Sequence, residues 1–249
     1  MLAAPLYYHK KMIMKAILSK IQAEIARHDK PENRSNYQQF FKEKLQEPIG
    51  LKVPVLRKIS NNIFRDLKTK PAADILDICD EILESDQRYK RFFAFEWAGK
   101  LKGQYRKSDF ARFERWLKNY VDNWGACDHF CGITGELLIQ YPNLCPKIRK
   151  WTKSQNRWLR RAAAVSLIDP VSDGLMLDEV FKTADLLLID DDDMVRKGYG
   201  WMLKEASNSF PDEVFGYVMK NKRHMPRTAL RYAIEKYPAA RRQEAMRRD

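Results

Sequence analysis

Apolar residues recur at intervals of three and four along almost the whole chain of 249 residues, the spacing that places them on one face of a helix. Strand-like alternation is scarce, and only 10 glycines interrupt the pattern. Helix starts are marked repeatedly, at Pro54, Pro71, Ser108, Pro146 and Pro211. The chain therefore predicts an all-α fold. The expected helices cover residues 12–27, 36–46, 54–67, 71–85, 87–102, 108–121, 124–141, 146–153, 156–168, 176–188, 191–206, 211–221 and 226–237.

Short helices joined by short turns form antiparallel pairs, and these pairs recur at a period of roughly 35–45 residues. The period resembles HEAT and armadillo arrays, in which each helix pair buries its apolar face against its neighbours. No Gly-, Ser- or Pro-rich linker divides the chain. We therefore expect one curved solenoid of antiparallel helix pairs, a HEAT-like superhelix that forms a single domain over residues 1–249. Within it, residues 1–30 are expected to form a loosely attached helix and residues 239–249 a flexible basic tail.

The formal net charge of +13 favours a polyanionic partner, with DNA, RNA and an anionic membrane surface as the candidates. No apolar run approaches the ~18 residues that a membrane-spanning helix requires. The N-terminal segment alternates lysines with apolar residues and lacks the features of a secretory signal. The 4 cysteines form no CxxC pair and no disulfide framework. We therefore expect a cytoplasmic monomer without a membrane partner.

The stretch from Lys147 to Arg161 is rich in basic residues and contains no acidic residue, which predicts a surface that binds phosphates. For any single member of this surface, a solvated basic face is the alternative interpretation. Basic side chains elsewhere in the chain extend the candidate surface. The candidate DNA-binding residues are Lys52, Lys147, Arg149, Lys150, Lys153, Arg157, Trp158, Arg160, Lys197, Lys204, Arg223, Arg227 and Arg231.

A tryptophan and a carboxylate share one helix face upstream of this basic stretch. Asn123 is placed to cap the helix, so that Trp124 falls in its first turn and Asp128 one turn later, at i and i+4. A carboxylate beside a phosphate-binding surface repels the ligand unless it has a function there. The combination favours chemistry on a cationic group within a nucleic acid. The alternative is that Trp124 packs in the core and Asp128 makes a structural hydrogen bond.

Three other features have simpler interpretations. Gly200 lies inside an expected helix, where its small size serves close helix packing or the approach of a ligand. The run from residue 190 to residue 193 consists of aspartates, which complement a helix N-terminus better than they predict a metal site. Cys127, His129 and Cys131 do not converge on one helix face, so we expect structural cysteines. No motif indicates a metal or a cofactor.

Together these segments resemble the AlkD family of bacterial DNA alkylation repair glycosylases, which are HEAT-like helical solenoids. The order and approximate spacing of the matching blocks make the resemblance more specific than any one motif. It implies a DNA partner whose damaged base need not be extruded into a deep pocket. The matching blocks are residues 50–54, 123–128, 154–163, 200–205 and 227–234.

The resemblance implies an activity, namely hydrolysis of the N-glycosidic bond of cationic alkylated purines such as 7-methylguanine and 3-methyladenine in double-stranded DNA. It implies that Asp128 is the catalytic carboxylate beside Trp124, that Arg161 supports the DNA backbone at the lesion, and that Trp201 is a second aromatic residue of the site. An alkylated purine already carries a positive charge, so it leaves without protonation. A fixed carboxylate then stabilises the oxocarbenium-like sugar.

Two positions depart from the family pattern. Gly125 follows Trp124 where a polar residue is expected, and Lys52 lies where relatives carry an uncharged polar side chain. Both changes bear on which lesion is accepted. Two other functions stay open, namely a non-catalytic HEAT-like module that binds distorted or branched DNA and a HEAT-type scaffold that binds a protein.

Overall fold

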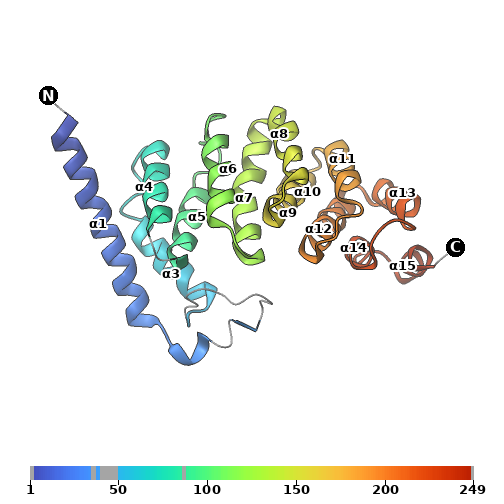
Figure 1. Ribbon diagram of the computed structural model, residues 1–249, viewed down its shortest axis with the longest axis horizontal. Helices are drawn as coiled ribbons and strands as arrows, with labels where there is room; N and C mark the ends of the chain where they lie inside the picture. Colours follow the sequence, from blue (N-terminus) through green and yellow to red (C-terminus); the bar gives the residue numbers. More distant parts are fainter. Residues whose placement is uncertain (1–2, 35–37, 40–49, 86–87, 248–249) are drawn as a thin grey trace. The chain divides into compact units, whose positions relative to one another are not determined.

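The computed structural model describes residues 3–34, 38–39, 50–85 and 88–247 (Figure 1). Over these residues the chain consists of helices and turns and contains no strand, which confirms the all-α prediction. The helix expected over residues 36–46 lies almost entirely outside the described residues. None of the described helices is long and apolar enough to span a membrane.

The chain divides into two compact units, residues 1–104 and residues 105–249. The expectation of a single domain over residues 1–249 stays a prediction. In the first unit, the long helix α1 buries Met14, Ile17, Ile21 and Ile25, whose spacing is that of one helix face, and packs on α3 and α4. The first unit contains α1 (Ala3–His28), η1 (Pro31–Asn33), α3 (Val53–Phe64), α4 (Ala72–Glu84), η2 (Arg88–Lys90) and α5 (Arg91–Gly99).

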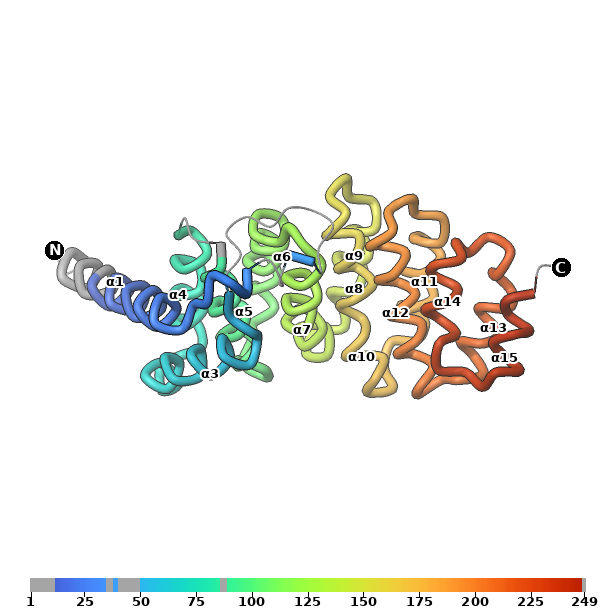
Figure 2. The backbone as a smooth tube through the Cα atoms, turned by 90° about the horizontal axis from the view of Figure 1, so that it is seen from below, coloured from blue at the N-terminus to red at the C-terminus, as the bar shows by residue number. Residues whose placement is uncertain are grey.

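The second unit carries most of the residues that the sequence singles out. Helices α7, α9, α12 and α14 contact one another in that order and form one layer, while α6 packs on α7 and both α11 and α13 pack on α12 (Figures 1 and 2). The unit contains α6 (Asp109–Tyr120), α7 (Trp124–Gln140), η3 (Pro142–Leu144), α8 (Cys145–Arg149), η4 (Lys150–Lys153), α9 (Arg157–Val165), α10 (Ile168–Ser172), α11 (Leu177–Leu187), α12 (Asp193–Ser209), α13 (Pro211–Asn221), α14 (Arg227–Ala233) and α15 (Ala239–Met246).

Two expected elements differ in the structure. The helix expected over residues 146–153 is split into α8 and the 3-10 helix η4, where the Thr152 hydroxyl donates to the Arg149 carbonyl at 2.8 Å and competes with the helical hydrogen bond. The break expected at Pro170 contains the short helix α10, because a proline in a first turn removes no helical hydrogen bond.

The chain after Pro238 also differs from expectation, because residues 239–246 form helix α15 rather than a flexible tail. Ala245 is fully buried. The guanidinium of Arg241 lies 4.9 Å from the centre of the Phe215 ring and pairs with Asp212 at 2.8 Å. These contacts anchor the helix to α13.

Small residues let the helices of the layer approach closely. A Cβ atom at Gly200 would lie 2.7 Å from the Ala229 carbonyl oxygen and 2.8 Å from the Tyr232 Cβ, so α12 and α14 are in backbone contact there. This confirms that Gly200 serves close helix packing. Between α7 and the end of α9, the Thr134 and Ser166 hydroxyls form a buried hydrogen bond of 2.6 Å. These contacts hold α12 against α14 and α7 against the end of α9.

Candidate functional site

A two-point ion pair joins α7 to α9. Arg161 donates from Nε to Asp128 Oδ1 at 2.8 Å and from its second terminal nitrogen to Asp128 Oδ2 at 2.9 Å. The Arg161 side chain is 7% exposed, and the Asp128 side chain is 19% exposed. The pair therefore presents the carboxylate at the surface and buries the guanidinium behind it. Paired geometry of this kind fixes the plane of the carboxylate as well as its position.

The start of α7 places Trp124 and Asp128. Asn123 has an extended backbone, with φ −150° and ψ 164°, and its side-chain oxygen accepts a hydrogen bond from the Ala126 amide at 2.9 Å. The predicted cap is thus confirmed. Trp124 is the first residue of α7 and is half-buried, and Asp128 follows one turn later.

Helix α12 supplies a third partner for the arginine. The other terminal nitrogen of Arg161 donates to the carbonyl oxygen of Met194, in the first turn of α12. A Cβ at Gly198 would lie 3.1 Å from Arg161 Cγ, so α12 approaches Arg161 closely because residue 198 lacks a side chain. The sequence analysis did not single out Met194 or Gly198. Two glycines inside one helix, at 198 and 200, are the signal for this packing.

The environment of Arg161 acts on its charge in opposite directions. Burial removes water from the guanidinium and favours its neutral form, but the hydrogen bonds and charge of Asp128 outweigh this and raise the pKa of Arg161. The guanidinium is therefore a permanent cation. In this structure the Arg161 side chain is directed at Asp128 and Met194. The expectation that Arg161 supports a DNA phosphate stays a prediction.

The cysteines near the pair, Cys127 and Cys131, are buried free thiols. Burial raises the pKa of the Cys127 thiol well above its usual value, and its sulfur lies 3.6 Å from the Trp158 carbonyl oxygen. All 4 cysteines of the chain are buried free thiols. Within the described part of the chain, no three His, Cys, Asp or Glu side chains meet as a metal site.

A second polar network holds Trp201 on α12. Its indole nitrogen donates to Glu205 Oε1 at 3.0 Å, across one helical turn. Glu205 Oε2 accepts from Lys236 at 2.7 Å and from Asn208 at 3.0 Å. Burial opposes the charge of Glu205, but the hydrogen bonds of Lys236 and Trp201 outweigh it and lower its pKa. Trp201 is half-buried, with its indole direction set by this carboxylate.

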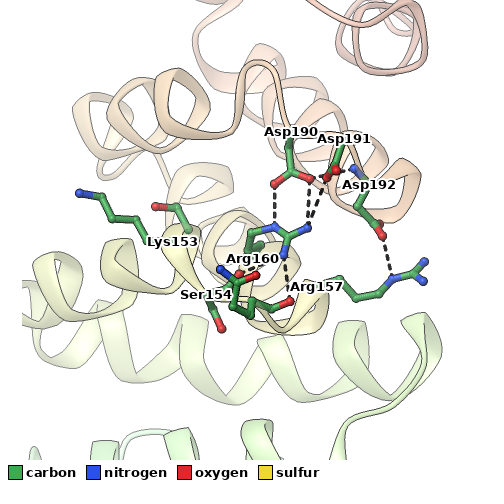
Figure 3. A pocket seen from close by; sticks show the side chains of 9 residues that line it. Lys153, Ser154, Arg157, Arg160, Asp190, Asp191 and Asp192 are labelled. Carbon is green, nitrogen blue, oxygen red and sulfur yellow. Dashed lines mark hydrogen bonds and ion pairs between the residues drawn. The ribbon is translucent and has the colours of Figure 1, made fainter.

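The basic stretch before α9 meets the aspartates before α12 in an open polar depression of about 580 Å³ (Figure 3). Arg160 donates from Nε to Asp190 at 2.7 Å and also donates to the Ser154 carbonyl at 2.9 Å. Arg157 pairs with Asp192 at 3.0 Å, whereas Lys153 points away from these pairs. Two arginines that were expected to contact phosphate are therefore engaged with carboxylates.

Trp158 and Arg149, two other candidate DNA-binding residues, make contacts within the protein in this structure. Trp158 is only 7% exposed, so the core takes up its indole and leaves little of it for a ligand. The Arg157 guanidinium lies 4.9 Å from the centre of that ring. Arg149 pairs with Glu179 on α11. The Arg149 side chain therefore joins α8 to α11.

The remaining candidates are paired or exposed. Lys197 pairs with Asp193 at 2.9 Å and Lys204 pairs with Glu235 at 3.3 Å, while Arg227 donates to the Met246 carbonyl at 3.3 Å. The exposed candidates are Lys52 in the first unit and Lys147, Lys150, Lys153, Arg223 and Arg231 in the second.

Comparison with known proteins places this arrangement in context. A family model described as "DNA alkylation repair enzyme" matches residues 21–237. The chain is similar in structure to a protein titled "Predicted DNA alkylation repair enzyme from Enterococcus faecalis", with 18% identity and a TM-score of 0.73 over 85% of this chain and 97% of that chain. It is also similar to AlkD2 from Streptococcus mutans, with 19% identity and a TM-score of 0.56 over 84% of this chain and 98% of that chain. No curated protein matches the sequence.

Proposed function

Because the chain belongs to the DNA alkylation repair enzyme family, we propose that it is a monofunctional DNA glycosylase that excises cationic alkylated purines from double-stranded DNA. The observation that carries the proposal is the Asp128 carboxylate, which is held on two points by a buried arginine and remains 19% exposed. Rigid placement of a partly exposed charge is what stabilisation of a charged transition state requires.

The leaving group determines which catalytic groups are needed. Alkylation at N7 of guanine or N3 of adenine gives the base a positive charge, so the N-glycosidic bond breaks without a general acid. Charge then moves to the sugar, which becomes oxocarbenium-like. A carboxylate is the side chain that stabilises such a cation, and Asp128 is the candidate.

Asp128 also has the capacity to orient water. A carboxylate offers about four lone-pair sites. Arg161 occupies one site on each oxygen, which leaves a second site on each for a water molecule. The attacking water would give C1′ its new bond to oxygen and release one proton to the solvent, and the base would leave as a neutral purine with the electrons of the broken bond.

The aromatic side chains complete the proposed site. We assign Trp124 and Trp201 to the cationic sugar or base, because an aromatic face attracts a cation by about 0.5–2 kcal/mol. Both are half-buried, and Glu205 holds the indole of Trp201.

The exposed basic residues of the second unit are assigned to the DNA phosphates. Lys150 and Lys153 are the clearest of them, since both are exposed and lie just before α9. Each phosphate contact would contribute a salt-dependent and sequence-independent share of the affinity.

One observation favours a non-catalytic alternative, a module of the same fold that binds distorted or branched DNA. Both oxygens of Asp128 accept hydrogen bonds from Arg161, which is also the geometry of a structural ion pair between two helices. In that case the Asp128 carboxylate would matter for stability and not for chemistry.

Base release from methylated duplex DNA distinguishes the two functions. Wild type, Asp128→Asn and the control Asp191→Asn, which removes an equal charge at a side chain that is 97% exposed, are compared by chromatography of the released bases. DNA affinity is measured alongside at one fixed salt concentration.

A glycosylase releases 7-methylguanine and 3-methyladenine with wild type and the control, and loses release with Asp128→Asn at similar or higher affinity. Binding of DNA by all three proteins without release of any base would establish the non-catalytic module. Thermal unfolding of each variant shows whether a lost activity reflects a lost fold.

A further inference from the structure

Asp192 connects the start of α12 to the Asp128–Arg161 pair, and we propose that it is a positioning residue for that pair. The inference rests on the proposed function, in which the pair forms the catalytic centre. Asp192 does not contact the pair itself. It acts through the first turn of α12, whose backbone supplies one of the three oxygen atoms that accept hydrogen bonds from Arg161.

The first link is a helix cap. Asp192 has φ −82° and ψ 125°, the extended backbone of an N-cap residue. Its Oδ1 accepts hydrogen bonds from the amides of Met194 at 2.8 Å and Val195 at 3.2 Å. The amides of a first turn have no partner within the helix, so this side chain holds the turn closed.

The second link is the carbonyl group of Met194. Its oxygen accepts a hydrogen bond from one terminal nitrogen of Arg161, while the other two nitrogens of the guanidinium donate to Asp128. A guanidinium is planar and rigid, so the position of one nitrogen limits the positions of the other two. The cap that holds Met194 in place therefore helps to place Arg161 against Asp128.

The third link joins the segment before α12 to α9. The other oxygen of Asp192, Oδ2, lies 3.0 Å from Arg157 Nε, and its backbone amide donates to Asp190 Oδ1 at 2.9 Å (Figure 3). Asp190 in turn accepts from Arg160 at 2.7 Å. The segment before α12 is thus anchored to the helix that carries Arg161, and this favours a fixed distance between the capped turn and the guanidinium.

The two oxygens of Asp192 have roles that substitution separates. Asparagine keeps a side-chain oxygen for the cap but loses the charge that pairs with Arg157. Alanine loses both. Asp191 is adjacent, carries the same charge and is 97% exposed, so Asp191→Ala is the matched control.

Hydrogen exchange at the Arg161 Nε–H group tests the proposal without any need for activity. This group donates to Asp128 Oδ1 at 2.8 Å and gives its own resonance in ¹⁵N NMR spectra, which Arg161→Lys identifies. We expect Asp192→Ala to accelerate its exchange about fivefold or more, in line with the loss of a helix cap, and Asp192→Asn to leave it close to wild type. Asp191→Ala should have no effect.

Single-turnover excision tests the same proposal through its effect on activity. With the cap lost, Asp192→Ala should release 7-methylguanine about fivefold more slowly at saturating protein, while Asp192→Asn restores the rate. If wild type releases no base, the proposed function fails, yet the exchange result still decides whether Asp192 positions Arg161.

Three results would overturn the inference. One is unchanged exchange of the Arg161 Nε–H group in Asp192→Ala. Another is an equal loss of protection in the backbone amides of α7, because that indicates general unfolding. A third is equal slowing of excision in Asp192→Asn and Asp192→Ala, since the charge that both variants lose, and not the cap, would then matter.

Discussion

The Asp128–Arg161 pair makes a measurable prediction about stability. Removing one partner of a fully buried ion pair costs about 3–5 kcal/mol, because the other charge is left buried without compensation. Arg161 is 7% exposed and Asp128 is 19% exposed, so water screens the pair in part. We therefore expect Asp128→Asn to lower the free energy of unfolding by about 2–3 kcal/mol. Arg161→Gln should cost less, about 1–2 kcal/mol, because it leaves the more exposed partner alone.

Urea unfolding of wild type, both single variants and the double variant measures the coupling of the two side chains. The double variant should lose about 1–2 kcal/mol less than the sum of the single losses, which lies within the range of about 0.5–3 kcal/mol for residues in direct contact. Losses that add within about 0.5 kcal/mol would refute the pairing, because additivity is the behaviour of independent sites. The same curves show whether Asp128→Asn is folded without urea, as the activity measurements require.

Three further predictions concern packing, acid stability and DNA binding. Gly200→Ala should destabilise the protein by about 1–2 kcal/mol, because its new Cβ meets a backbone oxygen at 2.7 Å. Gly216→Ala in α13 has open space around the new Cβ and should stabilise the protein by up to about 1 kcal/mol. Urea midpoints of the two variants that move in the same direction would contradict this. Because the pKa of Glu205 is lowered in the folded protein, its contribution to stability is complete above the unfolded pKa of 4.5 and is lost as the pH falls through the folded pKa. Below pH 4.5 the melting temperature of Glu205→Gln should therefore fall less than that of wild type. Parallel curves of melting temperature against pH would contradict this prediction. Replacing Lys150 and Lys153 together with alanine should reduce the slope of log affinity against log salt by about 2, and an unchanged slope would remove both from the DNA interface.

Local signals in the sequence predicted the elements well. The spacing of apolar residues indicated helices, Asn123 predicted the start of α7, and Gly200 predicted close packing on α14. Each of these depends on a few neighbouring residues or on one helix face. For such features, the residue type and its spacing are sufficient.

Contacts between distant segments were not predictable in the same way. Arg157 and Arg160 belong to a stretch without acidic residues, yet Asp192 and Asp190 neutralise them from a loop about 30 residues later. That pairing depends on how α12 packs beside α9, which depends in turn on glycines such as Gly198. The sequence indicates a basic stretch and an acidic run, but their contact follows from the packing of the helices.

The measurement that tests the central claim most directly is the single-turnover release of 7-methylguanine, a cationic base, and of hypoxanthine, a neutral one, from otherwise identical duplexes. Wild type should release 7-methylguanine at least about 100-fold faster than Asp128→Asn at saturating protein, because Asp128 stabilises the charged sugar. Neither protein should release hypoxanthine, since the proposed site uses no general acid. Release of 7-methylguanine by Asp128→Asn at the wild-type rate would contradict the assignment of Asp128 as the catalytic carboxylate.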